Sequence, residues 1–451
     1  MTHISDLDMA KKIAEKVKAL GGDSYFVGGY VRDGLRGISN KDIDFEVHGI
    51  SPKELREILD SLGQRMELGE SFGIFGLKGY TLDIAMPRKE EKRGLGHRNF
   101  DVIVDPNCGT FSASIRRDFT INAIMKNVLT GEIIDHFGGQ DDLKKGIIRH
   151  VNSESFIEDP LRVLRACQFA ARFDFTLSDE TVLLCKTMDL KELSRERIMG
   201  ELKKALLKAD KPSIFFKVLR EMNQLGYWFK ELEDLIGVPQ NEKFHKEGDA
   251  WTHTLMVLDE AVKFREQAEN PLGFMIAAIT HDFGKAVTTE FTKGAYHAYG
   301  HEIEGLPLVE SFMKRLTNEK QLISYVLNLT EYHMKPNLVA KVGSSVKSTN
   351  KMYDACQDPA GLIAIGMADG LGKIPKEDCE YNRRFLEERL EIYREYMSRP
   401  FVSGKDLIEA GIRPDEHFKE YLAFAHKLRL AGIEKESALK QTLAMARKNM
   451  K

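Results

Sequence analysis

The feature that most constrains the fold is a double glycine followed, after a short gap, by alternating carboxylates. Residues 28–33 read GGYVRD, and Asp42 and Asp44 follow within the segment DIDFEV. The alternation in DIDFEV predicts a β-strand, on which both carboxylates leave the same face. Glycines let backbone N–H groups approach a polyphosphate, and Arg32 adds a positively charged guanidinium group that can bind phosphate oxygens. Two carboxylates on one face suit Mg²⁺, so the pattern predicts metal-assisted attack on a nucleoside triphosphate.

Each half of this pattern is weak alone, because a double glycine is usually a turn and paired aspartates usually face solvent. The ordered combination of strand, double glycine, helix, turn and aspartate strand is far more specific. It resembles the first motif of nucleotidyltransferases that have a β-polymerase-like head. A further predicted strand carries Asp83, which we expect to face Asp42 and Asp44 as a general base or another metal ligand.

Composition bounds the class of protein. A chain of 451 residues predicts two to four domains, and its net charge of −3 means that nucleic-acid contacts must come from local patches, such as the basic segment 88–98. The five cysteines show no Cys-x-x-Cys spacing, which indicates reduced thiols. The chain has no apolar leader and no run of 18 apolar residues, so we expect a cytoplasmic protein without a membrane segment.

The pattern of periodicity changes along the chain and predicts four domains. Short strands, expected at 25–27, 43–47, 73–77 and 81–85, alternate with helices in residues 1–145. Residues 146–240 have helical periodicity throughout. A second helical block at 241–398 holds most of the histidines, and a small helical tail follows at 399–451.

Two arginine-rich motifs follow the aspartate strand. Arg116 and Arg117 precede a predicted helix, where two guanidinium groups suit a triphosphate clamp, and Asp118 either caps that helix or holds an arginine. Asp159 and Arg162 share one face at the start of another helix. They form either an ordinary capped helix start or an acceptor and donor pair for the edge of a base.

The order of these motifs resembles the bacterial class II CCA-adding tRNA nucleotidyltransferases and the related bacterial poly(A) polymerases over essentially the whole chain. The resemblance implies that Asp42 and Asp44 hold Mg²⁺, and that Asp159 and Arg162 select the base. It implies nucleotide contacts for Gly29, Arg32, Arg117 and Arg165, in addition to Asp159 and Arg162. It also implies a stabilising role for Arg197. Gln168 stands where this family usually has a further arginine, and it can hydrogen-bond but supplies no charge.

A second group of candidate metal ligands lies in the later helical block. The adjacent pair His281 and Asp282, with His253 upstream and Asp369 downstream, resembles the HD phosphohydrolases. Such ligands favour transition metals or Mg²⁺ without distinguishing them. His301 and His333 occur where many HD domains have further ligands, which leaves a second metal open. We expect His245 and His297 to be ordinary surface histidines.

The resemblance therefore implies an α+β nucleotidyltransferase head, an all-α neck and body, a helical HD domain and a small helical tail. The implied function is template-independent addition or repair of the 3′-terminal CCA of tRNA from CTP and ATP. The HD domain adds a metal-dependent phosphohydrolase. The alternatives are a poly(A) polymerase, an enzyme that adds only CC or only A, and a regulator whose polymerase head is vestigial.

Overall fold

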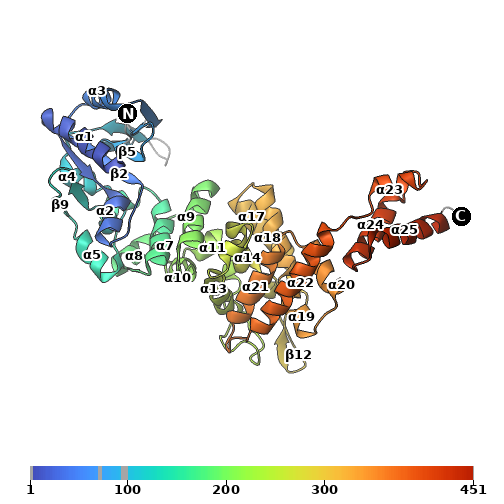
Figure 1. Ribbon diagram of the computed structural model, residues 1–451. Helices are drawn as coiled ribbons and strands as arrows, with labels where there is room; N and C mark the ends of the chain where they lie inside the picture. The colour runs from blue at the N-terminus through green and yellow to red at the C-terminus, as the bar shows by residue number, and fades with distance from the viewer. Residues whose placement is uncertain (1–3, 70–73, 93–99, 450–451) are drawn as a thin grey trace. The chain divides into compact units, whose positions relative to one another are not determined.

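The computed structural model of the chain describes residues 4–69, 74–92 and 100–449 (Figure 1). Its contacts divide the chain into two compact units, residues 1–197 with 214–224 and residues 198–213 with 225–451. Much of the basic segment 88–98, including Gly94 and Gly96, lies outside the described residues. Across the described part of the chain, no helix has the length and apolar character needed to span a membrane.

A seven-stranded sheet forms the centre of the first unit, with strand order β3-β4-β5-β2-β1-β8-β9. The strands are β1 (Asp23–Phe26), β2 (Ile43–His48), β3 (Arg65–Gly69), β4 (Ile74–Leu77), β5 (Leu82–Ala85), β8 (Met125–Asn127) and β9 (Ile133–Ile134). Neighbours are antiparallel except β2 and β5, whose parallel register pairs Asp44 with Asp83. The four strands predicted from sequence are confirmed with ends within two residues.

Apolar and acidic residues alternate along β2, which places the buried core on one face of the strand and the candidate site on the other. Ile43, Phe45 and Val47 are buried in one hydrophobic cluster with residues of helices α1 (Asp6–Ala19) and α3 (Pro52–Leu62). Asp44 and Glu46 therefore leave the opposite face of the strand. A shift of the strand register by one residue would exchange the two faces. Burial of the apolar side chains of β2 therefore fixes the register and keeps the carboxylates on the face away from the core.

The remaining elements of the first unit connect the sheet to helices. They are α2 (Gly28–Leu35), β6 (Arg88–Lys92), β7 (Phe100–Val104), α4 (Gly109–Ser114), η1 (Thr120–Asn122), α5 (Gly139–Lys145), β10 (Ile147–Ile148), α6 (Ser153–Phe156), α7 (Leu161–Phe173), β11 (Thr176–Leu177) and α8 (Asp179–Lys186). The prediction of a helix directly after Arg116 and Arg117 is wrong, because the next element is the three-residue turn η1. Asp118 accepts hydrogen bonds from the Phe119 N–H and from Asn122 Nδ2, which closes this turn.

Helices α9 (Arg195–Lys208) and α10 (Ser213–Glu221) contribute residues to both units. The second unit contains α11 (Leu225–Trp228), α12 (Lys230–Glu233), α13 (Ala250–Ala261), η2 (Arg265–Gln267), α14 (Pro271–Thr280), α15 (Lys285–Thr288), α16 (His301–Glu304), α17 (Leu306–Leu316), α18 (Lys320–Tyr332), α19 (Lys335–Lys341), α20 (Val346–Ala355), α21 (Pro359–Leu371), α22 (Glu380–Ser398), α23 (Gly404–Glu409), α24 (Phe418–Leu430) and α25 (Lys435–Asn449). Helices α13, α14, α18 and α21 pack on one another and carry or adjoin most of the predicted HD ligands.

One hairpin interrupts the block that we expected to be wholly helical. Strands β12 (Glu290–Thr292) and β13 (Ala295–His297) pair in an antiparallel register. Lys293 and Gly294 between them have φ values of 53° and 79°. Positive φ at both central residues is the conformation of a type I′ turn, which matches the twist of paired strands.

Candidate active sites

The double glycine packs directly against the carboxylate of Asp44. Val27 is extended, and α2 begins at Gly28 with a φ of 61°. A Cβ atom on Gly28 would lie 3.0 Å from Asp44 Oδ2. Gly28 is thus required both by its positive φ and by the carboxylate beside it. The backbone N–H of Gly29 donates a hydrogen bond to the same carboxylate.

Three carboxylates lie close together at the central strands β2 and β5. Asp44 and Asp83 are register partners on parallel strands, and Asp42 immediately precedes β2. Burial raises the pKa of Asp44, and the positive charge of Arg117 opposes that rise. The nearby charges of Asp83 and Asp42 raise it further. The mutual influence of these groups, and the oxygen-only character of the set, fit a divalent cation bound together with substrate phosphates.

Glu46 extends this carboxylate row and was missed by the sequence analysis. It is 7% exposed, its Oε2 accepts a hydrogen bond from Arg117 Nη2 at 2.9 Å, and its Oε1 lies 2.8 Å from His48 Nε2. Burial acts to raise the pKa of Glu46, but the His48 hydrogen bond and the Arg117 charge outweigh it and hold the pKa below its ordinary value. The available signal was the same two-residue alternation that identified Asp42 and Asp44.

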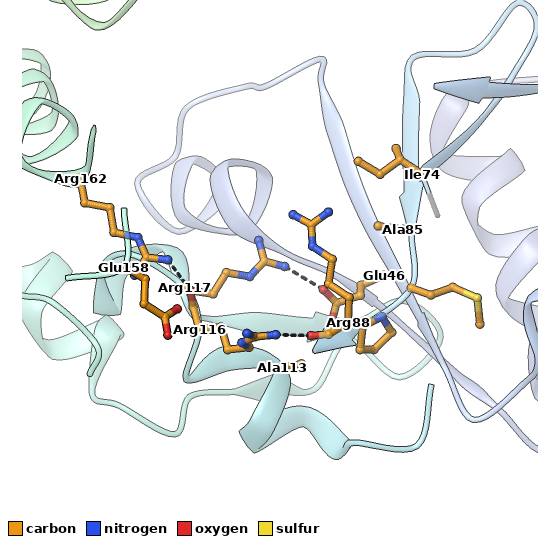
Figure 2. Close-up of a pocket in the computed structure, with 11 residues that line it drawn as sticks. Glu46, Ile74, Ala85, Arg88, Ala113, Arg116, Arg117, Glu158 and Arg162 are labelled. Atoms are coloured by element: carbon orange, nitrogen blue, oxygen red, sulfur yellow. Dashed lines mark hydrogen bonds and ion pairs between the residues drawn. The ribbon is translucent and has the colours of Figure 1, made fainter. Parts of the chain in front are cut away.

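An arginine-lined pocket of about 270 Å³ lies on the same face (Figure 2). Its lining residues are Glu46, Ile74, Ala85, Met86, Pro87, Arg88, Ala113, Arg116, Arg117, Glu158 and Arg162. Glu46 and Ala85 are register partners two positions beyond Asp44 and Asp83. The pocket therefore continues along the carboxylate face, although Asp42, Asp44, Asp83 and Gly29 do not line it.

The guanidinium group of Arg32 is buried within the first unit and is not exposed as a free ligand-binding group. Its Nε donates to Asp33 Oδ1 at 2.8 Å, and its Nη1 donates to Asn122 Oδ1 at 2.7 Å. The guanidinium carbon lies 4.7 Å from the centroid of the Phe173 ring. Nucleotide contact by Arg32 stays a prediction, since these donors are engaged within the chain.

Asp118 holds an arginine, which is one of the two tasks that the sequence left open, and it closes the η1 turn instead of capping a helix. Its Oδ1 closes the η1 turn, and its Oδ2 accepts a hydrogen bond from Arg165 Nε at 2.7 Å. Burial acts to raise the pKa of Asp118, but the charge of Arg165 outweighs this, and the pKa lies below its usual range. Arg165 is consequently oriented by a buried, ionised carboxylate.

Asp159 and Arg162 flank the start of α7 but bond to other groups. Arg162 donates to the carbonyl oxygens of Ser155 at 2.7 Å and Arg116 at 2.9 Å. Asp159 accepts from Arg197 at 2.8 Å, which agrees with the stabilising role expected for Arg197. Base selection by this pair stays a prediction. Gln168 is 1% exposed, and its Nε2 has no hydrogen-bond partner among the described residues.

All six predicted HD ligands converge in the second unit, where each is nearly or fully buried. They form two groups, His253 with His281 and Asp369, and Asp282 with His301 and His333. Within each group the candidate ligand atoms all lie within 4.8 Å of one another. The described residues contain one more such group, His245 with Glu247 and His253.

The orientation of the histidine rings shows that this donor set fits a metal. The Nδ1 atoms of His281, His301 and His333 lie 2.7–2.9 Å from backbone carbonyl oxygens three residues upstream. A carbonyl oxygen only accepts, so each Nδ1 carries a proton, and in the neutral ring Nε2 then keeps its lone pair for a metal. His301 Nε2 and His333 Nε2 nevertheless lie 3.3 Å apart. Two facing lone pairs, beside the Asp282 carboxylate, suit a cation between them.

Two lysines and a missed glutamate surround these ligands. Lys285 Nζ lies 2.6 Å from Asp282 Oδ2, and Lys373 Nζ lies 3.2 Å from Asp369 Oδ2. Glu247 Oε1 lies 3.1 Å from His253 Nδ1. Burial acts to raise the pKa of Glu247, but its contacts with His253 and other donors lower it to about 2. No local sequence pattern marked Glu247.

A pocket of about 410 Å³ opens onto the ligands Asp282, His301, His333 and Asp369. His245 and His297 line this pocket, so the expectation that both are ordinary surface histidines is wrong. His245 is held by a 2.7 Å contact from its Nδ1 to Glu247 Oε1. Tertiary folding brings each of them beside the metal-binding residues.

Three families match successive segments of the chain. The family described as "Poly A polymerase head domain" matches residues 24–149. "Probable RNA and SrmB- binding site of polymerase A" matches residues 174–236, and "HD domain" matches residues 250–369.

Curated relatives extend over most of the chain. A multifunctional CCA protein of Actinobacillus pleuropneumoniae serotype 5b is 36% identical over 373 residues, which cover 79% of this chain and 87% of that protein. The protein of the same name from Mannheimia succiniciproducens is 35% identical over 404 residues, covering 86% and 92%.

Solved structures share the fold. A CCA-adding enzyme in complex with ATP matches with a TM-score of 0.67 at 21% identity, over 97% of this chain and 95% of that chain. A Thermotoga maritima CCA-adding enzyme in complex with tRNA matches with a TM-score of 0.62 at 20% identity and the same coverage. The expected fold class, a nucleotidyltransferase head with a helical body and an HD domain, is confirmed.

Proposed function

Because this chain belongs to the family of multifunctional CCA proteins, we propose that it adds C, C and A to the 3′ end of tRNA from CTP and ATP. We propose in addition that its HD domain hydrolyses phosphoesters. The observation that carries the first activity is the pairing of Asp44 with Asp83 beside the arginine-lined pocket. The convergence of six metal-ligand side chains carries the second.

In the head, Asp42 and Asp44 would hold Mg²⁺, which supplies positive charge to the triphosphate and to the attacking hydroxyl group. The 3′-hydroxyl of the RNA attacks the α-phosphate of the nucleotide, and pyrophosphate leaves. Asp83, opposite Asp44, is available to accept the hydroxyl proton. Arg117 faces the negative charge that develops on the phosphate oxygens, and Glu46 holds its guanidinium in position.

Base selection is proposed for Asp159 and Arg162, which together offer an acceptor and a fork of donors. Their present partners are Arg197, the backbone N–H of Leu161 and two backbone carbonyls. Reading a base therefore requires that some of these bonds open when the nucleotide arrives. Gly29, Arg32 and Arg165 are proposed to complete the nucleotide site.

In the HD domain, His253, His281, Asp282 and Asp369 would hold a divalent metal, with His301 and His333 as ligands of a second ion. Such a metal supplies Lewis-acid activation of water for attack on a phosphoester. Lys285 and Lys373 bring positive charge to the same pocket. Blocked RNA ends that carry 2′,3′-cyclic or 2′-phosphates are the substrates that we propose.

The domain boundaries that we propose are 1–145, 146–240, 241–398 and 399–451. Family matches at 24–149, 174–236 and 250–369 support them, and the second match supports tRNA binding by the body. We also propose a cytoplasmic location, since all five cysteines are free thiols.

The test of the head is incorporation of labelled CTP and ATP, separately and together, into a tRNA that ends before its CCA. Two C residues from CTP alone, and one further A with both nucleotides, are expected. A long A ladder from ATP alone would instead identify a poly(A) polymerase. Addition of only CC or only A would identify a partial enzyme.

The two sites are separated by reciprocal variants. Asp42→Ala with Asp44→Ala is expected to abolish incorporation and to leave phosphohydrolase activity in place. Asp282→Ala is expected to have the opposite effect. Asp141→Ala is the matched control for the head, because this aspartate is exposed and has one weak ion pair at 4.0 Å. Incorporation that survives loss of both head aspartates would refute the assignment.

A further inference from the structure

The second unit contains a basic segment that the proposed chemistry of the two sites does not use. Residues 334–353 contain no aspartate or glutamate but have four lysines, which are Lys335, Lys341, Lys347 and Lys351. The segment covers α19, α20 and the turn between them, and the two helices pack on each other (Figure 1). All four lysines are exposed. In a chain with a net charge of −3, this segment is a local positive surface of the kind through which a nucleic acid can be bound.

The two lysines of α20 repel each other in the free protein. Lys347 and Lys351 stand four residues apart on the helix, so their ammonium groups share one face. Neither lysine forms an ion pair with another of the described residues. Asp354, the acidic residue one turn beyond Lys351, is held by His426 Nε2 at 2.9 Å. Two like charges at this spacing destabilise a helix, and a bound anion removes that repulsion.

Other exposed lysines of the same unit are arranged differently. Lys263 pairs with Glu260, and Lys314 pairs with Glu310, in each case within one helical turn of sequence. Such pairs neutralise the lysine locally and leave little charge for a partner. The unneutralised face of α20 therefore departs from the pattern shown by these lysines.

The two lysines of α19 are held loosely and extend the positive charge to the neighbouring helix. Lys335 Nζ lies 3.7 Å from the centroid of the Tyr332 ring, and Lys341 Nζ lies 3.6 Å from Glu377 Oε1. An exposed ion pair of this length contributes little to the fold, so the ammonium group can turn to another anion. Lysines at both ends of α19 and on α20 are too widely spread for one small anion. A nucleic-acid strand presents phosphate after phosphate along its length.

The other exposed residues of α20 favour a nucleic acid over a membrane. They are Ser348, Asp354 and Ala355, so the face with the two lysines has no large apolar side chain. Leu338 and Val342 are exposed on α19. A helix that lies on a membrane needs a continuous apolar face, which these two side chains on a seven-residue helix do not supply.

We infer that the HD domain docks the phosphate backbone of RNA on the basic surface formed by Lys335, Lys341, Lys347 and Lys351. This inference rests on the proposed action on tRNA, and it adds a contact region outside the body, residues 146–240, to which we otherwise assign tRNA binding. Contacts to phosphates orient the RNA and add affinity, but they carry no sequence preference.

The salt dependence of tRNA binding by the full chain tests this surface. Each lysine that neutralises a phosphate contributes about 0.7 to 0.9 to the slope of log affinity against log salt concentration. Lys347→Ala with Lys351→Ala is therefore expected to weaken tRNA binding and to reduce that slope by about 1.4 to 1.8. The affinity ratio of wild type to variant then shrinks about 7- to 12-fold when the salt concentration rises fourfold. Fluorescence anisotropy with labelled tRNA measures both quantities, and an unchanged slope overturns the inference.

Two further variants separate a local contact from an effect of net charge. Lys347→Arg with Lys351→Arg is expected to keep the slope, because arginine retains the charge. Lys263→Ala with Lys314→Ala is the matched control, since it removes the same charge from exposed lysines of the same unit. An equal loss of slope in this control overturns the inference. Alanine is a strong helix former, so the unfolding temperature of the Lys347 and Lys351 double variant is expected to stay unchanged.

Two further measurements distinguish the remaining outcomes. Sedimentation with phosphatidylserine vesicles tests a membrane: vesicle binding that the double alanine variant loses, with an unchanged tRNA slope, overturns the inference. Absence of tRNA binding by wild type would refute the proposed action on tRNA. Titration of a duplex RNA without a tRNA fold then decides the surface, because phosphate contacts do not depend on sequence. An equal slope for wild type and variant on this duplex overturns the inference.

Discussion

Replacement of Glu46 by glutamine tests whether the buried carboxylate organises the head site. Glu46 contacts Arg117 at 2.9 Å and His48 at 2.8 Å. Glutamine keeps the shape and one acceptor, and the His48 ring can change tautomer to accept from the new amide. Both contacts survive as hydrogen bonds to an uncharged amide, each weaker by about 1 kcal/mol than a bond to the carboxylate. The local free energy of unfolding is therefore expected to fall by about 2 kcal/mol, since the Arg117 side chain is only 31% exposed.

The sign of the pH dependence follows from the depressed pKa of Glu46. A carboxyl group whose pKa is lower in the folded state stabilises the fold above its unfolded pKa, which is near 4.5. That contribution is lost as the pH falls from this value through the folded pKa. The difference between wild type and Glu46→Gln is thus expected in full at pH 7 and to shrink below about pH 4.5.

Hydrogen exchange is the assay that resolves this effect. The two tryptophans of the chain, Trp228 and Trp251, both belong to the second unit, so their fluorescence does not report on the head. A loss of about 2 kcal/mol corresponds to about 30-fold faster exchange of the protected β2 amides. Glu57→Gln is the control, because Glu57 is 67% exposed and its ion pair with Lys53 is 3.9 Å long. Unchanged exchange at pH 7, or a difference that does not shrink as the pH falls through the folded pKa of Glu46, would refute the reasoning.

Three further predictions concern the other buried carboxylates and the HD metal. Asp118→Asn is expected to lower the free energy of unfolding of the head by about 1–2 kcal/mol and to weaken nucleotide binding, because Arg165 loses its charged partner. Hydrogen exchange of the η1 amides measures the first effect, and nucleotide titration measures the second. Glu247→Gln is expected to weaken metal binding to the HD domain about 10- to 100-fold, because Glu247 contacts His253 Nδ1; metal titration checks it, and equal affinity would contradict it. Removal of the metal with a chelator is expected to lower the unfolding temperature of the second unit, followed by the fluorescence of Trp251, and an unchanged temperature would argue against a bound metal.

The candidate sites differ in how much of each could be predicted. In the head, the alternation of 42–47 identified two carboxylates, and the same pattern contained Glu46, whose importance appears only once Arg117 is its partner. In the HD domain, six side chains were predicted from their chemical types together with the resemblance to HD phosphohydrolases. Glu247 was not, because nothing in its local sequence distinguishes it from an exposed glutamate.

Two predictions failed for physical reasons that local periodicity does not contain. The helix expected after Arg117 is replaced by the η1 turn, since Asp118 satisfies the backbone N–H of Phe119 and the amide of Asn122. The hairpin within the second helical block depends on two residues with positive φ, Lys293 and Gly294. In each case a short polar contact or a turn outweighs helix propensity.

The sequence by itself determined the strand alternation, the order of the motifs and the chemical identity of most ligands. These properties follow from residue type and short-range spacing, which the chain carries before it folds. Only the tertiary structure decided which atoms meet. It joins Glu46 to Arg117, buries Arg32 against Asn122, and brings His301 within 3.3 Å of His333. Such contacts join residues far apart in sequence, so they depend on how whole elements pack and not on any local pattern.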